Sequence, residues 1–184
     1  MPDQFQPSVD AAARAGLAPL TLVLGGARSG KSRFAEELVE HTQRPALYLA
    51  TAEPHDDEMR ARIAAHRARR GGRWTTIEEP LEIVNALLTE ETRPVLIDCL
   101  TLWLSNLLGA QRDIGFEIER LLAALPRIKA PVVLVANEVG LGIVPENALA
   151  REFRDHAGRL NQGVARLAQR VVFTAAGLPL ALKG

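Results

Sequence analysis

A glycine-rich octapeptide near the start of the chain has the residue types of a phosphate-binding loop. It reads Gly25-Gly26-Ala27-Arg28-Ser29-Gly30-Lys31-Ser32 and fits the pattern G-x-x-x-x-G-K-[ST] at each fixed position. Glycines let the backbone wrap closely around a phosphate, and the N–H groups of a helix N-terminus point at the anion. We expect Lys31 to reach the outer phosphates and the Ser32 hydroxyl to bind Mg²⁺. The octapeptide predicts a nucleoside triphosphate site; the alternative is a glycine-rich turn without a ligand.

An acid at the end of a later apolar run is the expected partner of this loop. Asp98 follows Val95-Leu96-Ile97, and an acid at the end of a buried strand commonly holds the Mg²⁺ of a bound nucleotide, directly or through water. The alternative is that Asp98 caps the helix that follows it.

A third candidate is the only histidine that lies among several arginines. On a helix, side chains at steps of three and four share one face. That face would hold Arg62, His66, Arg69 and Arg70 of the expected helix 56–70, and Arg73 if the helix continues that far. Guanidiniums would stabilise phosphate charge, and a neutral imidazole can act as a nucleophile. Spacing alone favours a solvated helix with an acidic start and a basic end.

The elements that must position these residues follow from the apolar pattern. Continuous apolar runs separated by helical patterns predict a mainly parallel sheet covered by helices on both faces. The expected strands are 20–24, 46–50, 74–77, 94–98, 131–136 and 171–175, with 178–182 pairing beside the last. The expected helices are 32–41, 56–70, 81–88, 100–108, 116–125 and 149–168. Ligands of such sheets bind beyond the carboxyl ends of the strands, which is where the loop and Asp98 fall.

Composition excludes several classes of protein. Of 184 residues, 47% are hydrophobic and 24% charged, as in one ordinary globular domain, which we place at 19–184 after a flexible extension, 1–18. Lys plus Arg and Asp plus Glu both number 22, which argues against broad nucleic-acid binding. The single cysteine excludes a disulfide framework, and no apolar run is long enough for a membrane span. A reducing, cytoplasmic setting is expected.

With these motifs, the chain closely resembles the bifunctional adenosylcobinamide kinase and adenosylcobinamide-phosphate guanylyltransferase family of cobalamin biosynthesis. The resemblance covers about residues 20–184, nearly everything but the extension. The resemblance is carried by short motifs spread along the chain. They are the octapeptide with Arg33, then residues 48–52, 56–59, Arg62 with Ile63, His66 with Arg67, Trp74 with Glu78, and residues 98–101, 105–108, 137–147, 151–155 and 158–162. The stretch 137–147 is the most distinctive of these.

The resemblance implies a fold, two reactions and a set of site residues. The implied fold is a three-layer α/β P-loop NTPase of RecA-like architecture. The implied reactions are phosphorylation of the aminopropanol hydroxyl of adenosylcobinamide by a nucleoside triphosphate, and transfer of GMP from GTP through a guanylylated histidine, giving adenosylcobinamide-GDP. That histidine is His66, and GTP, ATP and Mg²⁺ are the implied ligands. The implied nucleotide contacts beyond the loop are Ala50, Thr51, Ala52, Arg67, Ala68, Arg69, Arg70, Glu78 and Asp98.

Two further assignments remain hypotheses. Glu78 would accept hydrogen bonds from guanine N1–H and the 2-amino group, which would explain a preference for GTP. The stretch 137–147 follows the clearest strand and is favoured as a site or a subunit contact over a plain surface loop. The family implies a homo-oligomer, a trimer.

Two other functions compete with this interpretation. The first is a P-loop kinase of another small alcohol, in which His66 is structural. The second is a nucleic-acid-dependent ATPase with a patch over 60–73, which the zero net charge and the 4% aromatic content disfavour.

Overall fold

The structure is a computed structural model that describes residues 16–53, 57 and 71–184. The expected extension 1–18 lies outside the described residues except for its last three positions. The expected helix 56–70 lies outside them except for Asp57.

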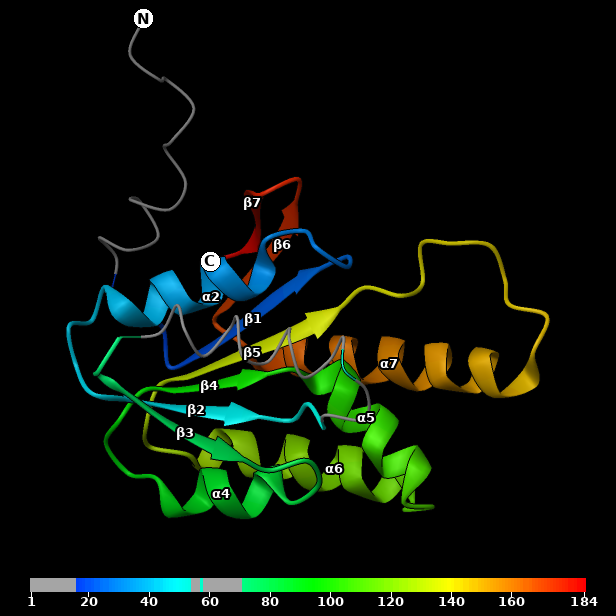
Figure 1. Ribbon diagram of the computed structural model, residues 1–184, viewed down its shortest axis with the longest axis horizontal. Coiled ribbons are helices and arrows are strands. Elements are labelled where there is room, and N and C mark those ends of the chain that lie inside the picture. The colour runs from blue at the N-terminus through cyan, green and yellow to red at the C-terminus, as the bar shows by residue number, and fades with distance from the viewer. Residues whose placement is uncertain (1–15, 54–56, 58–70) are drawn as a thin grey trace, which may run out of the picture.

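A single sheet of seven strands forms the middle layer (Figure 1), in the order β3-β2-β4-β5-β1-β6-β7. Every pair in it is parallel except β6 with β7, which is antiparallel. The strands are β1 (Leu20–Gly25), β2 (Ala46–Ala50), β3 (Trp74–Glu78), β4 (Val95–Asp98), β5 (Val132–Asn137), β6 (Arg170–Ala175) and β7 (Leu178–Lys183). The mainly parallel sheet is therefore confirmed.

Helices cover both faces of this sheet (Figure 1). On one face lies α2 (Lys31–Glu40). On the other lie α4 (Ile83–Thr89), α5 (Leu100–Gly109), α6 (Ile114–Ala124) with the 3-10 turn Leu125–Arg127, and α7 (Ala148–Leu167). No helix among the described residues is long and apolar enough to cross a membrane.

Side chains that point alternately to the two faces of the sheet form two separate hydrophobic cores. In β1, Leu22 and Leu24 pack toward the four-helix face, whereas Val23 packs with Phe34 and Leu38 of α2. Side chains of successive strand residues point to opposite faces, so a continuous apolar run fills both layers. The site must lie at the rim of this sandwich, because its interior is filled.

A buried glutamate holds part of the four-helix face together. Glu117 of α6 is 2% exposed and is paired with Arg112 and Arg120, and both arginines also bind Glu82. Hydrogen bonds from Arg120 and Arg112 lower the pKa of the Glu82 carboxyl. Glu82 lies just after β3, so this network anchors the segment that follows Glu78.

The expected elements within the described residues are present, with ends that differ by one or two positions. The prediction for Asn137 was wrong, since this residue ends β5 rather than opening the loop after it. The reason is tertiary: Asn137 pairs with Gly25 of β1, and its amide donates to the Thr101 hydroxyl at 2.7 Å.

Candidate functional site

The octapeptide forms a tight loop between β1 and α2. The Ser29 amide donates to the Gly26 carbonyl at 3.3 Å, and the Phe34 amide donates to the Gly30 carbonyl at 3.0 Å. Arg28 has a φ of 57° and Gly30 a φ of 94°, both in the left-handed region. A chain that turns this way before a helix directs successive amides toward one point, which is the geometry of an anion site.

Gly25 is required by close packing. A Cβ on Gly25 would lie 2.5 Å from both Ser29 Oγ and the Thr174 carbonyl oxygen. The first glycine of the motif therefore lets the loop fold back over the end of its own strand.

The turn between β6 and β7 supports the loop from outside. The Gly177 amide donates to the Ser29 carbonyl at 2.9 Å. A Cβ on Gly30 would lie 3.1 Å from the Gly177 Cα, and Ala176 and Gly177 have φ values of 51° and 79°. This contact spans most of the chain length and was not anticipated from the sequence.

Lys31 and Ser32 begin α2 beside the loop. Lys31 is 6% exposed, and its Nζ donates to the Gly26 carbonyl at 3.0 Å, which keeps the ammonium over the loop. Ser32 is half-buried in the first turn of the same helix. A cation and a helix N-terminus at one point make this the most favourable place for polyphosphate in the described part of the chain.

Asp98 ends β4, at the same edge of the sheet. The Tyr48 hydroxyl donates to its Oδ2 at 2.9 Å and so orients the carboxylate. The residue that caps α5 is Cys99, so the alternative that Asp98 is the helix cap is wrong.

The donors at this edge fit a magnesium ion bound with a nucleotide. Asp98 lies two strand steps from β1, about 10 Å at the usual spacing of about 4.8 Å, a span that phosphates and water can bridge. A hydroxyl from Ser32 and a carboxylate from Asp98 are hard oxygen ligands, as Mg²⁺ prefers. The described residues contain no cluster of three or more His, Cys, Asp or Glu able to hold a metal alone, so phosphate would have to complete the coordination.

Thr51 joins the ends of β2 and β4. Its hydroxyl donates to the Cys99 carbonyl at 2.8 Å and accepts from the Cys99 amide at 2.7 Å. The Asn106 side chain donates to the carbonyls of Thr51 and Pro80. Burial, with a smaller effect of Asp98, raises the pKa of the Cys99 thiol to about 11, so it is no nucleophile at neutral pH.

Replacing Thr51 by valine tests this link. We expect a loss of about 1–3 kcal/mol in the free energy of unfolding, because the buried Cys99 amide loses its acceptor. Urea unfolding of T51V and T51S measures it. T51S keeps the hydroxyl and should retain most of the stability; equal losses in the two variants would contradict the hydrogen-bond explanation.

The other residues implied by the resemblance divide into two groups. Glu78 and Ala50 are brought into line with Asp98, since Ala50 pairs with Glu78 on one side and with Asp98 on the other, and half-buried Ala52 follows β2. The second group lies outside the described residues: His66, Arg67, Ala68, Arg69 and Arg70. They belong to the connection that leaves the carboxyl end of β2 and returns to the start of β3.

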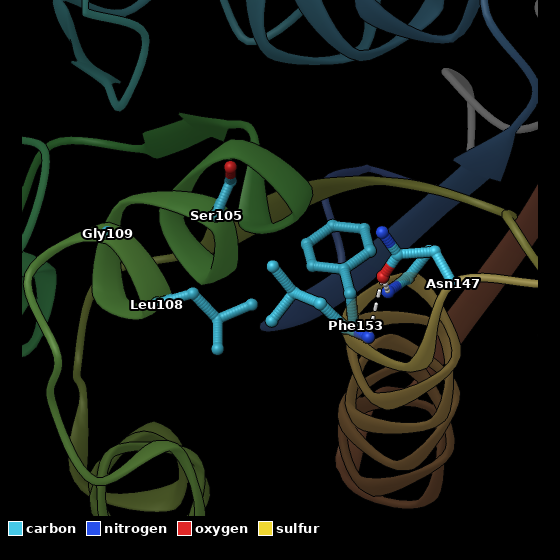
Figure 2. A pocket seen from close by; sticks show the side chains of 7 residues that line it. Ser105, Leu108, Gly109, Asn147 and Phe153 are labelled. Atoms are coloured by element: carbon cyan, nitrogen blue, oxygen red, sulfur yellow. Dashed lines mark hydrogen bonds between the residues drawn. The ribbon is translucent and has the colours of Figure 1, made fainter.

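A separate groove lies between α5 and α7 (Figure 2). It has a volume of about 540 Å³. Leu108 of α5 and Phe153 of α7 extend into it from opposite walls, and none of the expected nucleotide- or metal-binding residues lines it. Asn147, which ends the stretch 137–147 expected as a site or a subunit contact, is among its lining residues. Its lining residues are Ser105, Leu108, Gly109, Asn147, Leu149, Ala150 and Phe153.

Several residues at this edge had no role assigned from the sequence. They are the polar residues Tyr48, Thr101, Asn106, Asn137 and Asn161, together with Gly177 of the turn between β6 and β7. The available signal was a polar residue inside an otherwise apolar element, such as Tyr48 within Ala46–Ala50 and Asn106 within Leu100–Gly109. Such a residue indicates a position with a special role, but the sequence does not show which residue it contacts.

Solved structures share this fold at low sequence identity. The flagellar accessory protein FlaH from Methanocaldococcus jannaschii superposes with a TM-score of 0.54 at 14% identity, covering 98% of this chain and 86% of that one. A prototypical ATPase of the type III secretion system of pathogenic bacteria gives 0.58 at 11% identity, covering 92% and 60%. At these identities the likeness shows the fold alone. The strand order is RecA-like, because β5 lies between β1, which leads into the phosphate loop, and β4, which ends at Asp98.

Sequence relatives are much nearer. The bifunctional adenosylcobalamin biosynthesis protein CobP of Pseudomonas aeruginosa is 51% identical over 168 residues, covering 89% of this chain and 96% of that protein. CobU of Escherichia coli is 43% identical over 182 residues, covering 89% and 99%. The family model for cobinamide kinase / cobinamide phosphate guanyltransferase matches residues 21–182. The chain, with its complete phosphate loop and the acid of β4, therefore belongs to the cobinamide kinase / cobinamide phosphate guanyltransferase family.

Proposed function

We propose that this enzyme phosphorylates the aminopropanol hydroxyl of adenosylcobinamide and then attaches GMP to the phosphate, giving adenosylcobinamide-GDP. The observation that carries the proposal is the family match over residues 21–182, which includes the whole loop and Asp98. GTP and ATP are the proposed nucleotides, and Mg²⁺ the proposed metal.

In the kinase step the chain positions the phosphates and offsets their charge. The loop amides and the Lys31 ammonium hold the triphosphate, while Ser32 and Asp98 hold the metal. When bound, Mg²⁺ neutralises charge on the phosphate oxygens. The alcohol oxygen forms a bond to the terminal phosphorus, the bond from that phosphorus to the bridging oxygen breaks, and the nucleoside diphosphate leaves.

In the transferase step we assign the nucleophile to His66. Its ring nitrogen attacks the α-phosphorus of GTP, pyrophosphate leaves, and the phosphate of the phosphorylated corrinoid then displaces the histidine. Arg67, Arg69 and Arg70 would stabilise the departing pyrophosphate. Support comes from the place of His66 in the chain, in a connection that begins at the carboxyl edge beside Asp98.

We assign recognition of guanine to Glu78. It is exposed at the carboxyl end of β3, four strand steps from β1, about 19 Å at about 4.8 Å per step. A nucleotide with its phosphates near the loop must therefore lie along the edge, past β5, β4 and β2, to place its base there.

Replacing Glu78 by glutamine tests this assignment. We expect the preference for GTP over ATP in nucleotidyl transfer to fall about 10- to 100-fold, because a carboxylate that accepts two N–H groups is replaced by an amide that accepts one. The ratio of kcat/KM for the two nucleotides is the measurement. E119Q, at an exposed position of α6, is the matched control; an unchanged ratio in E78Q removes the assignment.

We also propose a homo-oligomer, a trimer as the family resemblance implies, working in the cytoplasm. Strongly exposed apolar side chains on the loop after β5 support a subunit contact: Leu141 is 80% and Ile143 96% exposed. A free, buried Cys99 is compatible with a reducing compartment.

The deciding experiment supplies the purified protein with Mg²⁺, GTP or ATP, and adenosylcobinamide, and follows the corrinoid by mass spectrometry. We expect one phosphoryl adduct and, with GTP, its conversion to the GDP derivative. A phosphoryl adduct of some other alcohol but none of adenosylcobinamide would establish the competing kinase function. Absence of both corrinoid products would overturn the proposal.

A further inference from the structure

The carboxamide oxygen of Asn137 is one of three buried side-chain oxygens at the site edge that have no hydrogen-bond partner among the described residues; the other two are Ser29 Oγ and Thr174 Oγ1. The backbone of Asn137 is fixed on both sides, since its amide donates to the Thr101 hydroxyl and its carbonyl accepts from the Asn161 side chain at 3.2 Å. The backbone is therefore held in one place while the side-chain oxygen is unsatisfied.

Fold requirements do not account for an asparagine here. The hydrogen bonds to the Thr101 hydroxyl and from the Asn161 side chain involve only the main chain of residue 137, so a valine or leucine would make them equally well. A buried acceptor without a donor destabilises a protein, and native proteins keep few of them. The donor that Asn137 lacks can arrive with a ligand, provided that the side chain turns toward it, because Oδ1 itself has almost no exposed surface.

The position of Asn137 identifies which part of a ligand that is. Asn137 pairs with Gly25, where the phosphate loop begins, and the next amide, of Glu138, donates to the Gly25 carbonyl at 3.2 Å. On its other side, β5 borders β4, and Asp98 pairs with Val135, two residues before Asn137. Asn137 thus ends the one strand between the loop and the metal-binding acid, where the terminal phosphate of a triphosphate held by both would be.

Because Asn137 Oδ1 is a hydrogen-bond acceptor, only a donor among the groups near the terminal phosphate can satisfy it. Phosphate oxygens are acceptors and cannot satisfy Oδ1, whereas a hydroxyl group can donate to it. In the kinase step the group that approaches the terminal phosphate is an alcohol.

We propose that Asn137 binds the attacking hydroxyl of the acceptor alcohol, accepting its hydrogen bond at Oδ1; this rests on the proposed function. A neutral amide takes no proton. It turns a lone pair of the alcohol oxygen toward phosphorus; the new O–P bond forms as the bridging P–O bond breaks, and the hydroxyl proton passes to solvent. Asn137 is then a residue of the kinase step alone, because guanylylation of the histidine uses no alcohol.

The test compares the two half-reactions in N137A. We expect phosphorylation of adenosylcobinamide to lose on the order of 100-fold in kcat, the usual effect of misplacing a reacting group. Labelling of the protein by α-labelled GTP without corrinoid should stay within about threefold of wild type, as should the Kd for ATP. Q162A, at an exposed amide of α7, controls for truncation of the side chain and should leave both reactions unchanged.

Other outcomes overturn the assignment in distinguishable ways. Unchanged phosphorylation in N137A removes it directly. Equal losses in both half-reactions would mean that the amide serves the nucleotide or a metal-bound water instead. Loss of folded protein is checked by the Kd of N137A for ATP: a variant that binds ATP within about threefold of wild type is folded at the site, and if it also phosphorylates adenosylcobinamide at the wild-type rate the assignment is contradicted. A wild type that makes neither product removes the proposed function together with this assignment.

Discussion

Replacement of His66 by alanine is expected to abolish covalent labelling of the protein by GTP, while phosphorylation of adenosylcobinamide continues near the wild-type rate. Loss of a covalent nucleophile leaves no alternative path of similar rate, so guanylyl transfer should fall by about 10⁴-fold or more. In the proposed kinase step the loop, Lys31 and Asp98 hold the phosphates and the metal, and all of them come from other parts of the chain. The two activities should therefore separate at one residue.

The measurement is incubation with Mg²⁺ and GTP labelled at the α-phosphate, followed by denaturing electrophoresis. A phosphorus–nitrogen bond to histidine is labile to acid and stable to alkali, so this stability pattern identifies the residue type. H41A is the matched control, since His41 lies exposed at the end of α2. Label on H66A would assign the nucleophile to another residue, and unlabelled wild type that still binds GTP would reduce the enzyme to a kinase.

Replacement of Lys31 by methionine is the change with the widest expected effect. Methionine keeps the length of the side chain and removes the charge, so the outer phosphates lose a nearly buried ammonium that the Gly26 carbonyl holds over the loop. Removing one such donor from a preorganised site usually costs about 10²–10³-fold in rate. We expect a loss of that size in phosphorylation and in guanylyl transfer if both use this loop.

Values of kcat/KM for both reactions, and the Kd for each nucleotide, measure the effect. K129M is the control, because Lys129 is exposed and pairs with exposed Glu91. Full activity of K31M in both reactions would exclude the loop as the phosphate site. Loss of phosphorylation alone would show that GTP guanylylates the histidine from a different nucleotide site.

Much of the fold was predictable because its signals are local. A buried parallel strand reads as a short apolar run, and β1, β2, β4 and β5 were all expected from that pattern. The phosphate loop was predictable for a related reason: its glycines and its lysine act within eight consecutive residues, between a strand and a helix. Asp98 could be placed because the end of its strand was predictable.

The family was also recognisable from sequence, through motifs spread over the chain, and this is how His66 and Glu78 became candidates. Their roles came with that resemblance. From spacing alone a solvated helix was the better explanation of the segment around His66. One histidine among arginines shows the same spacing on a solvated charged helix as it does in a catalytic site.

The amino-acid sequence by itself thus determined the layers, the phosphate loop and the family. The tertiary structure decided which residues meet: Tyr48 with Asp98 across 50 positions, Thr51 with Cys99 across 48, Gly177 with Ser29, and Asn137 between Gly25 and β4. Local patterns specify a strand and its faces, whereas the order of strands in a sheet depends on how helices pack across it. The partners of a side chain at the sheet edge follow from that order, and so the buried, unsatisfied oxygen of Asn137 became visible only in the folded chain.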